Sequence, residues 1–97
     1  MIIIITKKNY EPKIPDCLVL NNDVWLMSDY ALKCGDTTYD FDYLIIEDLS
    51  LCHDLDKTGI LLDEGIPVTN FMMATSLDNI YYGDLETALD DLFNKEE

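Results

Sequence analysis

The chain has 97 residues and a formal net charge of −14 at pH 7, because 20 acidic side chains face six lysines and there is no arginine. This length predicts a single domain over residues 1–97, and an apolar content of 48% argues against a disordered chain. A chain this acidic and without arginine argues against direct binding of nucleic acid, whose phosphates are held mostly by basic side chains.

No apolar run approaches the roughly 18 residues that are needed to cross a bilayer. The apolar start, residues 1–5, is followed by Lys7 and Lys8, whereas a signal peptide carries its cations in front of the apolar run. Cys17, Cys34 and Cys52 are odd in number and match no zinc spacing, so we expect reduced thiols. These features predict a cytoplasmic protein that does not contact membranes.

The first apolar segment, residues 2–6, is β-branched and predicts a strand buried on both faces. Pro12 and Pro15 then predict a loop over residues 7–16. Two apolar runs follow around Asn-Asn-Asp, which is typical of a hairpin with strands at 17–20 and 24–27.

A second tight hairpin is predicted around Cys34, Gly35 and Asp36, with strands at 30–33 and 37–41. Residues 42–47 predict a strand suited to the middle of a sheet. Residues 48–57 predict a short helix or helical turn with Asp48 as its cap. Two short apolar runs surround Glu64-Gly65, and Pro67 restricts the second run to a sheet edge or to a non-strand conformation.

The last quarter of the chain predicts a strand at 79–82, a turn at Gly83 and a helix over about 84–94 that Asp84 caps. Apolar residues recur at helical spacing, so we expect Leu85, Leu89 and Leu92 to be buried. Strands that precede one good helix predict an α+β domain, with a mostly antiparallel sheet of short strands and one C-terminal amphipathic helix.

No residue pattern predicts an active site. Cys52 and His53 are adjacent, and neighbours on a helix or strand point in different directions. Asp40 and Asp42 can converge on one cation from the same strand face, but no calcium-binding loop is present. We therefore expect no enzymatic activity, no bound cofactor and no dedicated metal site.

One stretch is similar to the flavin-dependent disulfide oxidoreductases. Residues 55–68 and then Thr75-Ser76-Leu77-Asp78-Asn79-Ile80-Tyr81-Tyr82-Gly83-Asp84 resemble the segment of that family that ends in T-S-x-x-N-I-Y-x-x-G-D. The resemblance implies a contact between Asp84 and FAD. The glycine fingerprint for the dinucleotide phosphates and the redox cysteine pair of the family are absent from this sequence.

The composition resembles that of small phage-encoded inhibitors that mimic nucleic acid, which include anti-restriction and anti-CRISPR proteins. That resemblance implies binding to a basic protein surface that normally holds nucleic acid. Carboxylates outside the apolar pattern are the candidate binding residues: Asp36, Asp40, Asp42, Glu86, Asp90 and Asp91. Two alternatives remain, a cofactor-binding fragment that uses Asp84, and an acidic subunit or antitoxin-like protein whose apolar segment 71–74 is a contact patch.

Overall fold

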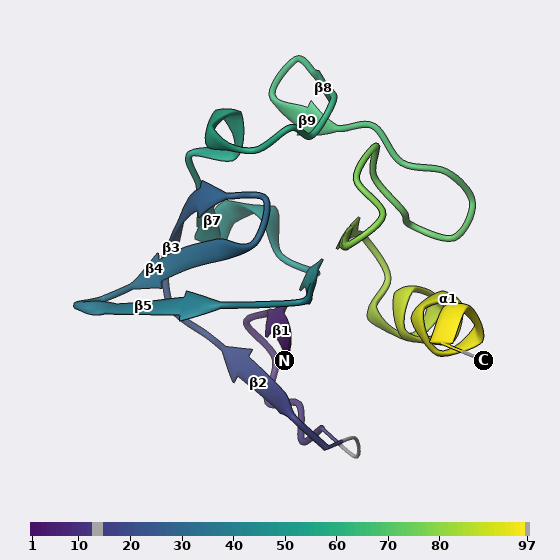
Figure 1. Ribbon diagram of the computed structural model, residues 1–97, viewed down its shortest axis with the longest axis horizontal. Helices are drawn as coiled ribbons and strands as arrows, with labels where there is room; N and C mark the ends of the chain where they lie inside the picture. The colour runs from purple at the N-terminus through teal and green to yellow at the C-terminus, as the bar shows by residue number, and fades with distance from the viewer. Residues whose placement is uncertain (13–14, 97) are drawn as a thin grey trace.

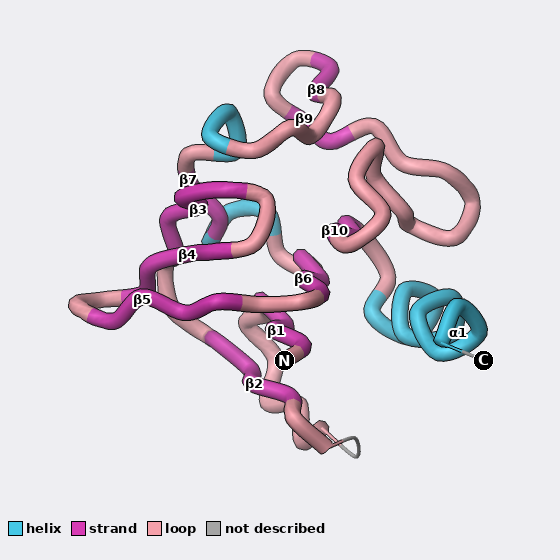
Figure 2. Tube along the Cα trace, in the orientation of Figure 1, coloured by secondary structure: helices cyan, strands magenta, loops and turns pink. Residues whose placement is uncertain are grey.

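The computed structural model describes residues 1–12 and 15–96, and side chains as far as residue 94. Within this part, ten short strands in three sheets precede one α-helix, which confirms the prediction of a single small α+β domain (Figures 1 and 2). The elements are β1 (Ile2–Ile5), β2 (Cys17–Leu20), β3 (Val24–Ser28), β4 (Ala31–Cys34), β5 (Thr37–Asp40), β6 (Tyr43–Ile46), β7 (Cys52–His53), β8 (Leu62–Asp63), β9 (Ile66–Pro67), β10 (Ile80–Tyr82) and α1 (Leu85–Glu96).

The sheet at the centre of the molecule is parallel throughout, in the order β10-β6-β1-β2. The prediction of a mostly antiparallel sheet is therefore wrong for the sheet that carries the core. An apolar run of four residues indicates a strand that is buried on both faces, but it does not indicate whether the strand is parallel or antiparallel to its neighbours. The prediction that residues 42–47 contain a central strand is confirmed, because β6 lies between β1 and β10.

The parallel sheet is buried on both faces, since successive side chains of a strand point to opposite sides. Ile4, Ile45 and Tyr81 pack against helix α1. Ile3, Ile5 and their neighbours on the other face pack against a second, mostly antiparallel sheet, in which β7 pairs with β3 in parallel. The molecule thus has three layers, with α1 and the antiparallel sheet on opposite sides of the parallel sheet (Figure 1).

The second sheet has the order β5-β4-β3-β7. The hairpin predicted around Cys34-Gly35-Asp36 is confirmed, with Cys34 paired to Thr37. The hairpin predicted between 17–20 and 24–27 is wrong, because β2 belongs to the parallel sheet and β3 to the antiparallel one. The Asn21 amide donates to the carbonyl oxygens of Thr6 (2.6 Å) and Lys8 (3.1 Å), which fixes the chain as it crosses between the layers.

The middle of the chain contains two 3₁₀ turns and a small hairpin. The helical turn predicted at 48–57 appears as Leu49–Leu51 and Leu55–Lys57, separated by β7. Asp48 caps the first turn by accepting from the Ser50 backbone N–H, as predicted. Pro67 lies in the two-stranded sheet β8-β9, which agrees with its predicted edge position. The described part of the predicted loop 7–16 has no helix or strand, and residues 13–14 lie outside the description.

Helix α1 begins as predicted, because the Asp84 carboxylate accepts from the backbone N–H of Thr87 at 3.0 Å. Leu85 and Leu92 are buried against the parallel sheet, as expected. The expectation for Leu89 is wrong in degree, since this side chain is only half-buried at the margin of the same cluster. Ala88 takes the central contact position instead, because its small side chain allows the helix to approach the sheet closely.

Gly83 is required at the start of α1. Its φ is +133°, and a Cβ atom at this position would lie 2.5 Å from the Met73 sulfur. We expect Gly83→Ala to lower the free energy of unfolding by about 1–3 kcal/mol, since backbone strain adds to a steric clash. Chemical denaturation measures this effect. Gly65→Ala is the control, because Gly65 has φ +81° and no atom within 4 Å of the added Cβ; equal losses for both variants would contradict the proposed clash.

Candidate functional site

Acidic side chains gather at the amino ends of the parallel strands. Asp16 directly precedes β2, Asp42 directly precedes β6, and Asp78 lies two residues before β10. Because these strands are parallel, they all begin at the same end of the sheet, which we call the amino-end edge. The strand order therefore places the three aspartates in a row along this edge, with neighbouring strands about 4.8 Å apart.

Three adjoining hollows meet at this edge, with volumes of about 550, 480 and 460 Å³. Asp42 lines all three of them, and Tyr30 and Tyr43 each line two. Among the described residues that line these hollows, four are aspartates and none is lysine. We call this region the Asp42 surface and define it by Asp16, Tyr30, Asp40, Asp42, Tyr43 and Asp78.

The Asp42 surface keeps most of its negative charge accessible. The terminal amine of Met1 forms ion pairs with the carboxylates of Asp42 (2.5 Å) and Asp16 (3.1 Å). Hydrogen bonds to Asp42 and then Asp16 raise the pKa of this amine. The side chains of Asp42 and Asp16 nevertheless remain 77% and 73% exposed, so both can meet a ligand from solvent.

Of the six carboxylates predicted from sequence as a binding site, only Asp40 and Asp42 lie on the Asp42 surface. Asp36 lies in the turn between β4 and β5, at the opposite end of β5 from Asp40 (Figure 1). Sequence reasoning missed Asp16 and Asp78. Each precedes an expected strand by one or two residues, but their convergence depends on parallel strand order, which the sequence does not reveal.

The three predicted carboxylates on α1 differ from one another. Glu86 and Asp90 are exposed, as expected. Asp91 is half-buried and accepts a 2.7 Å hydrogen bond from the phenolic oxygen of Tyr81. Burial, strengthened by the bond to Asp91, raises the pKa of the Tyr81 hydroxyl far above its usual value. Asp91 therefore contacts the core through Tyr81, although it lies outside the apolar pattern of the sequence.

We expect the Tyr81–Asp91 hydrogen bond to stabilise the fold by about 1–2 kcal/mol, because the acceptor is charged and the ring is fully buried. A double-mutant cycle with Tyr81→Phe and Asp91→Ala, followed by urea unfolding, measures this coupling. Tyr81→Phe with Asp90→Ala is the matched cycle and should show no coupling. Equal coupling in both cycles would contradict a specific bond between Tyr81 and Asp91.

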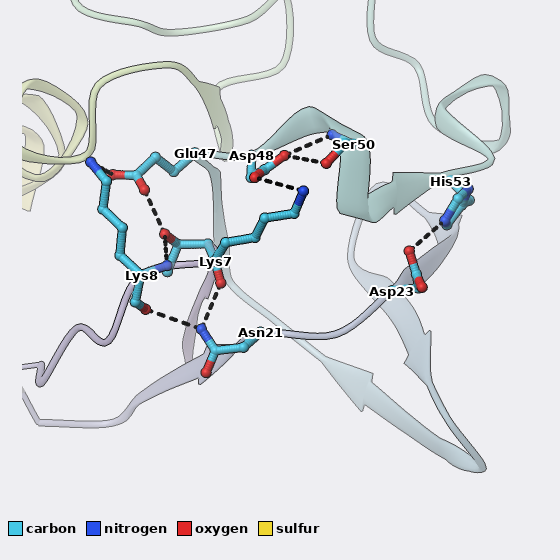
Figure 3. A network of polar contacts seen from close by, with 9 residues as sticks. Lys7, Lys8, Asn21, Asp23, Glu47, Asp48, Ser50 and His53 are labelled. Carbon is cyan, nitrogen blue, oxygen red and sulfur yellow. Dashed lines mark hydrogen bonds and ion pairs between the residues drawn. The ribbon is translucent and has the colours of Figure 1, made fainter.

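At the opposite end of the parallel sheet, where the strands finish, lies a smaller cleft of about 380 Å³, several of whose polar residues appear in Figure 3. Lys7 and Lys8 follow β1 there and form ion pairs of 3.6 Å with Asp48 and 3.7 Å with Glu47. Glu47 also accepts a 2.5 Å hydrogen bond from the hydroxyl of buried Thr6. Each lysine thus has a carboxylate partner in the same chain.

Asp84 lines this second cleft, but its contacts are structural. The hydroxyl and backbone N–H of Thr87 bind its carboxylate and, with a weaker contribution from Lys8, lower the pKa of Asp84. The folded-state pKa lies below the unfolded one, so the stabilisation is present above about pH 4 and is lost as the pH falls through the lowered pKa.

The second cleft lacks the features that hold a dinucleotide. Such sites use glycines after the first strand and a helix N-terminus that binds the pyrophosphate. Here Thr6, Lys7 and Lys8 follow β1 in place of glycines, and the helix N-terminus at this cleft, that of α1, is capped by the Asp84 carboxylate, which would repel a pyrophosphate. These residues do not fit FAD, and the geometry gives no support to the contact between Asp84 and FAD that the sequence resemblance implies.

Cys52 and His53 do not form a catalytic pair. The His53 ring binds Asp23 at 3.0 Å (Figure 3) and also stacks on Trp25, with ring centroids 5.1 Å apart. Cys52 is buried, and desolvation raises the pKa of its thiol to about 12, which opposes nucleophilic chemistry. All three cysteines are free, as predicted.

Among the described residues, no group of three or more His, Cys, Asp or Glu side chains is arranged to hold a metal ion. The same part of the chain contains no helix that is long and apolar enough to span a membrane. No family model, curated protein or solved structure matches this chain.

Proposed function

We propose that this protein binds a cationic segment of another protein on the Asp42 surface. It would thereby act as an acidic decoy that occupies a basic groove made for nucleic acid. One observation carries the proposal: four aspartates from three separate chain segments converge on adjoining hollows whose described lining contains no lysine.

The chemistry of the Asp42 surface suits a partner rich in arginine or lysine. Its carboxylates can form charge-assisted hydrogen bonds with guanidinium or ammonium groups. Tyr30 is 61% exposed and offers a ring face on which a guanidinium can stack. The carboxylates stand at the end of a buried sheet, so little conformational entropy is lost when they bind.

The remaining charge supports the same function from a distance. A net charge of −14 creates a field that attracts a basic partner and accelerates the encounter. Glu86, Asp90 and Asp36 contribute to this field without lining the Asp42 surface. We therefore expect their neutralisation to slow association, and the loss of Asp40 or Asp42 to speed dissociation as well.

The test compares three proteins in capture from a nuclease-treated lysate at low salt. Besides wild type, these are Asp16→Asn/Asp40→Asn/Asp42→Asn and the equal-charge control Asp36→Asn/Asp54→Asn/Asp56→Asn. Asp16 and Asp54 both have φ near +60°, which asparagine tolerates. Each variant therefore places one asparagine in a left-handed backbone conformation, and the two variants are matched in this respect. Both variants should melt within a few degrees of wild type, because relief of repulsion offsets the loss of the exposed ion pairs between the Met1 amine and Asp16 and Asp42.

Proteins retained by wild type and by the control, but lost by the Asp42-surface variant, are the expected partners. A DNA or RNA oligonucleotide added in excess should release them, as should rising salt. Partners that stay bound to the Asp42-surface variant would refute the proposed surface. Partners that nucleic acid does not release would refute the decoy mechanism.

A further inference from the structure

The hairpin β8-β9 carries exposed apolar side chains on its outer face. Its register pairs Leu62 with Pro67 and Asp63 with Ile66, and the Val68 N–H donates to the Leu61 carbonyl at 3.0 Å. Since strand side chains alternate, Leu62 and Pro67 point inward, while Leu61, Ile66 and Val68 share the outer face with Asp63. These three apolar side chains are 61%, 51% and 43% exposed.

The loop that follows β9, which Figure 1 shows extending away from the hairpin, carries two more exposed apolar side chains. Phe71 is 96% exposed and Met72 is 37% exposed. The loop is closed by its own hydrogen bonds, because the Asn70 side chain accepts from the N–H groups of Met72 (2.8 Å) and Ala74 (3.1 Å). A hydrogen-bonded turn therefore fixes the backbone in a conformation that exposes the Phe71 side chain to solvent. We call Leu61, Ile66, Val68, Phe71 and Met72 the hairpin face.

Five exposed apolar side chains within twelve consecutive residues indicate an interaction surface. A hairpin with strands of two residues is marginal in water by itself, so an apolar outer face is costly unless a partner covers it. A fixed, exposed aromatic ring is also the usual anchor of a protein contact.

The charge and the area of the hairpin face indicate what kind of partner binds there. Asp63 and Glu64 are the only charged residues between positions 61 and 72, so the segment that carries the hairpin face has only negative charges. A second copy would bring like charge against like charge. The apolar side chains offer roughly a few hundred Å², well below the roughly 800 Å² per partner of a standard globular interface.

We propose that the hairpin face binds an amphipathic, cationic helix of a partner protein. The apolar stripe of the helix covers Val68 and Phe71, and its flanking lysine or arginine side chains meet Asp63 and Glu64. This contact is separate from the Asp42 surface and does not require the decoy function.

Two synthetic peptides serve as probes. One is an amphipathic helix of leucine and arginine, and the other has alanine in place of every leucine, with the same length and charge. At physiological ionic strength, wild type should bind the leucine peptide at least about tenfold more tightly than the alanine peptide, since only the former covers apolar surface.

The variant Val68→Ser/Phe71→Ser should reduce the ratio of the two affinities, leucine peptide over alanine peptide, nearly to one. Trp25→Ser/Met27→Ser, which changes two other exposed apolar residues, should preserve it. Val68→Ser/Phe71→Ser should melt within a few degrees of wild type, and the folded control should melt lower, because it also loses the stacking of Trp25 on His53. Calorimetric titration measures the affinities.

An unchanged ratio in Val68→Ser/Phe71→Ser would overturn the proposal. So would a ratio that falls equally in Trp25→Ser/Met27→Ser. A wild-type protein that sediments as a dimer, with a monomeric Val68→Ser/Phe71→Ser variant, would assign the hairpin face to a second copy and also overturn it. The Asp42-surface variant should keep the ratio, which separates this result from the decoy test.

Discussion

Leu92→Ala is expected to lower the free energy of unfolding by about 2–5 kcal/mol. Leu92 is fully buried between α1 and the parallel sheet, in one cluster with Ile4, Ile45 and Tyr81. Removing its side chain leaves a cavity that a sheet fixed on its other face cannot readily fill. Urea denaturation followed by circular dichroism measures the loss.

Leu89→Ala is the control for this prediction, since Leu89 lies three residues earlier on α1 but is only half-buried. Its loss should be clearly smaller than that of Leu92→Ala, because less apolar surface returns to water. If Leu89→Ala were the more destabilising of the two variants, the orientation of α1 on the sheet described above would be wrong.

Leu32→Ala should also cost about 2–5 kcal/mol, although Leu32 lies in the layer on the other side of the parallel sheet. Leu32 in β4 is fully buried and packs in one cluster with Ile3, Ile5 and Leu44. The exposed neighbour Lys33 is the control, and Lys33→Ala should change stability by no more than about 0.5 kcal/mol. Comparable losses for the two variants would contradict the alternation of β4 side chains.

The double variant Leu32→Ala/Leu92→Ala tests the three-layer arrangement. The two leucines belong to separate clusters on opposite faces of the parallel sheet, so their losses should add within about 0.5 kcal/mol. A large departure from additivity, in a variant that still unfolds cooperatively, would indicate that both side chains share one core.

Local chemistry predicted the ends of elements well. Asp84 and Asp48 cap their turns because their carboxylates reach free backbone N–H groups nearby, and Gly83 and Gly35 supply the positive φ that their turns need. Such contacts join residues a few positions apart, so a single sequence contains the information that they require.

Long-range pairing was not predictable in the same way. The runs 17–20 and 24–27 looked like a hairpin because two polar asparagines separate them, yet β2 pairs in parallel with β1. The choice depends on where Leu20 and Val24 find their core, which involves residues far away in the chain. The candidate site shared this difficulty, because Asp16 and Asp78 join Asp42 only through parallel strand order.

The measurement that tests the central claim most directly is an NMR titration of the ¹⁵N-labelled protein with an oligo-arginine peptide. Binding at the amino ends of the parallel strands predicts the largest amide shifts at residues 16–17, 40–43 and 78–80. The shifts should saturate, weaken with added salt, and vanish in Asp16→Asn/Asp40→Asn/Asp42→Asn. Shifts that are largest at Glu86 and Asp90 on α1, or that spread evenly over all acidic residues, would contradict a docking surface at Asp42.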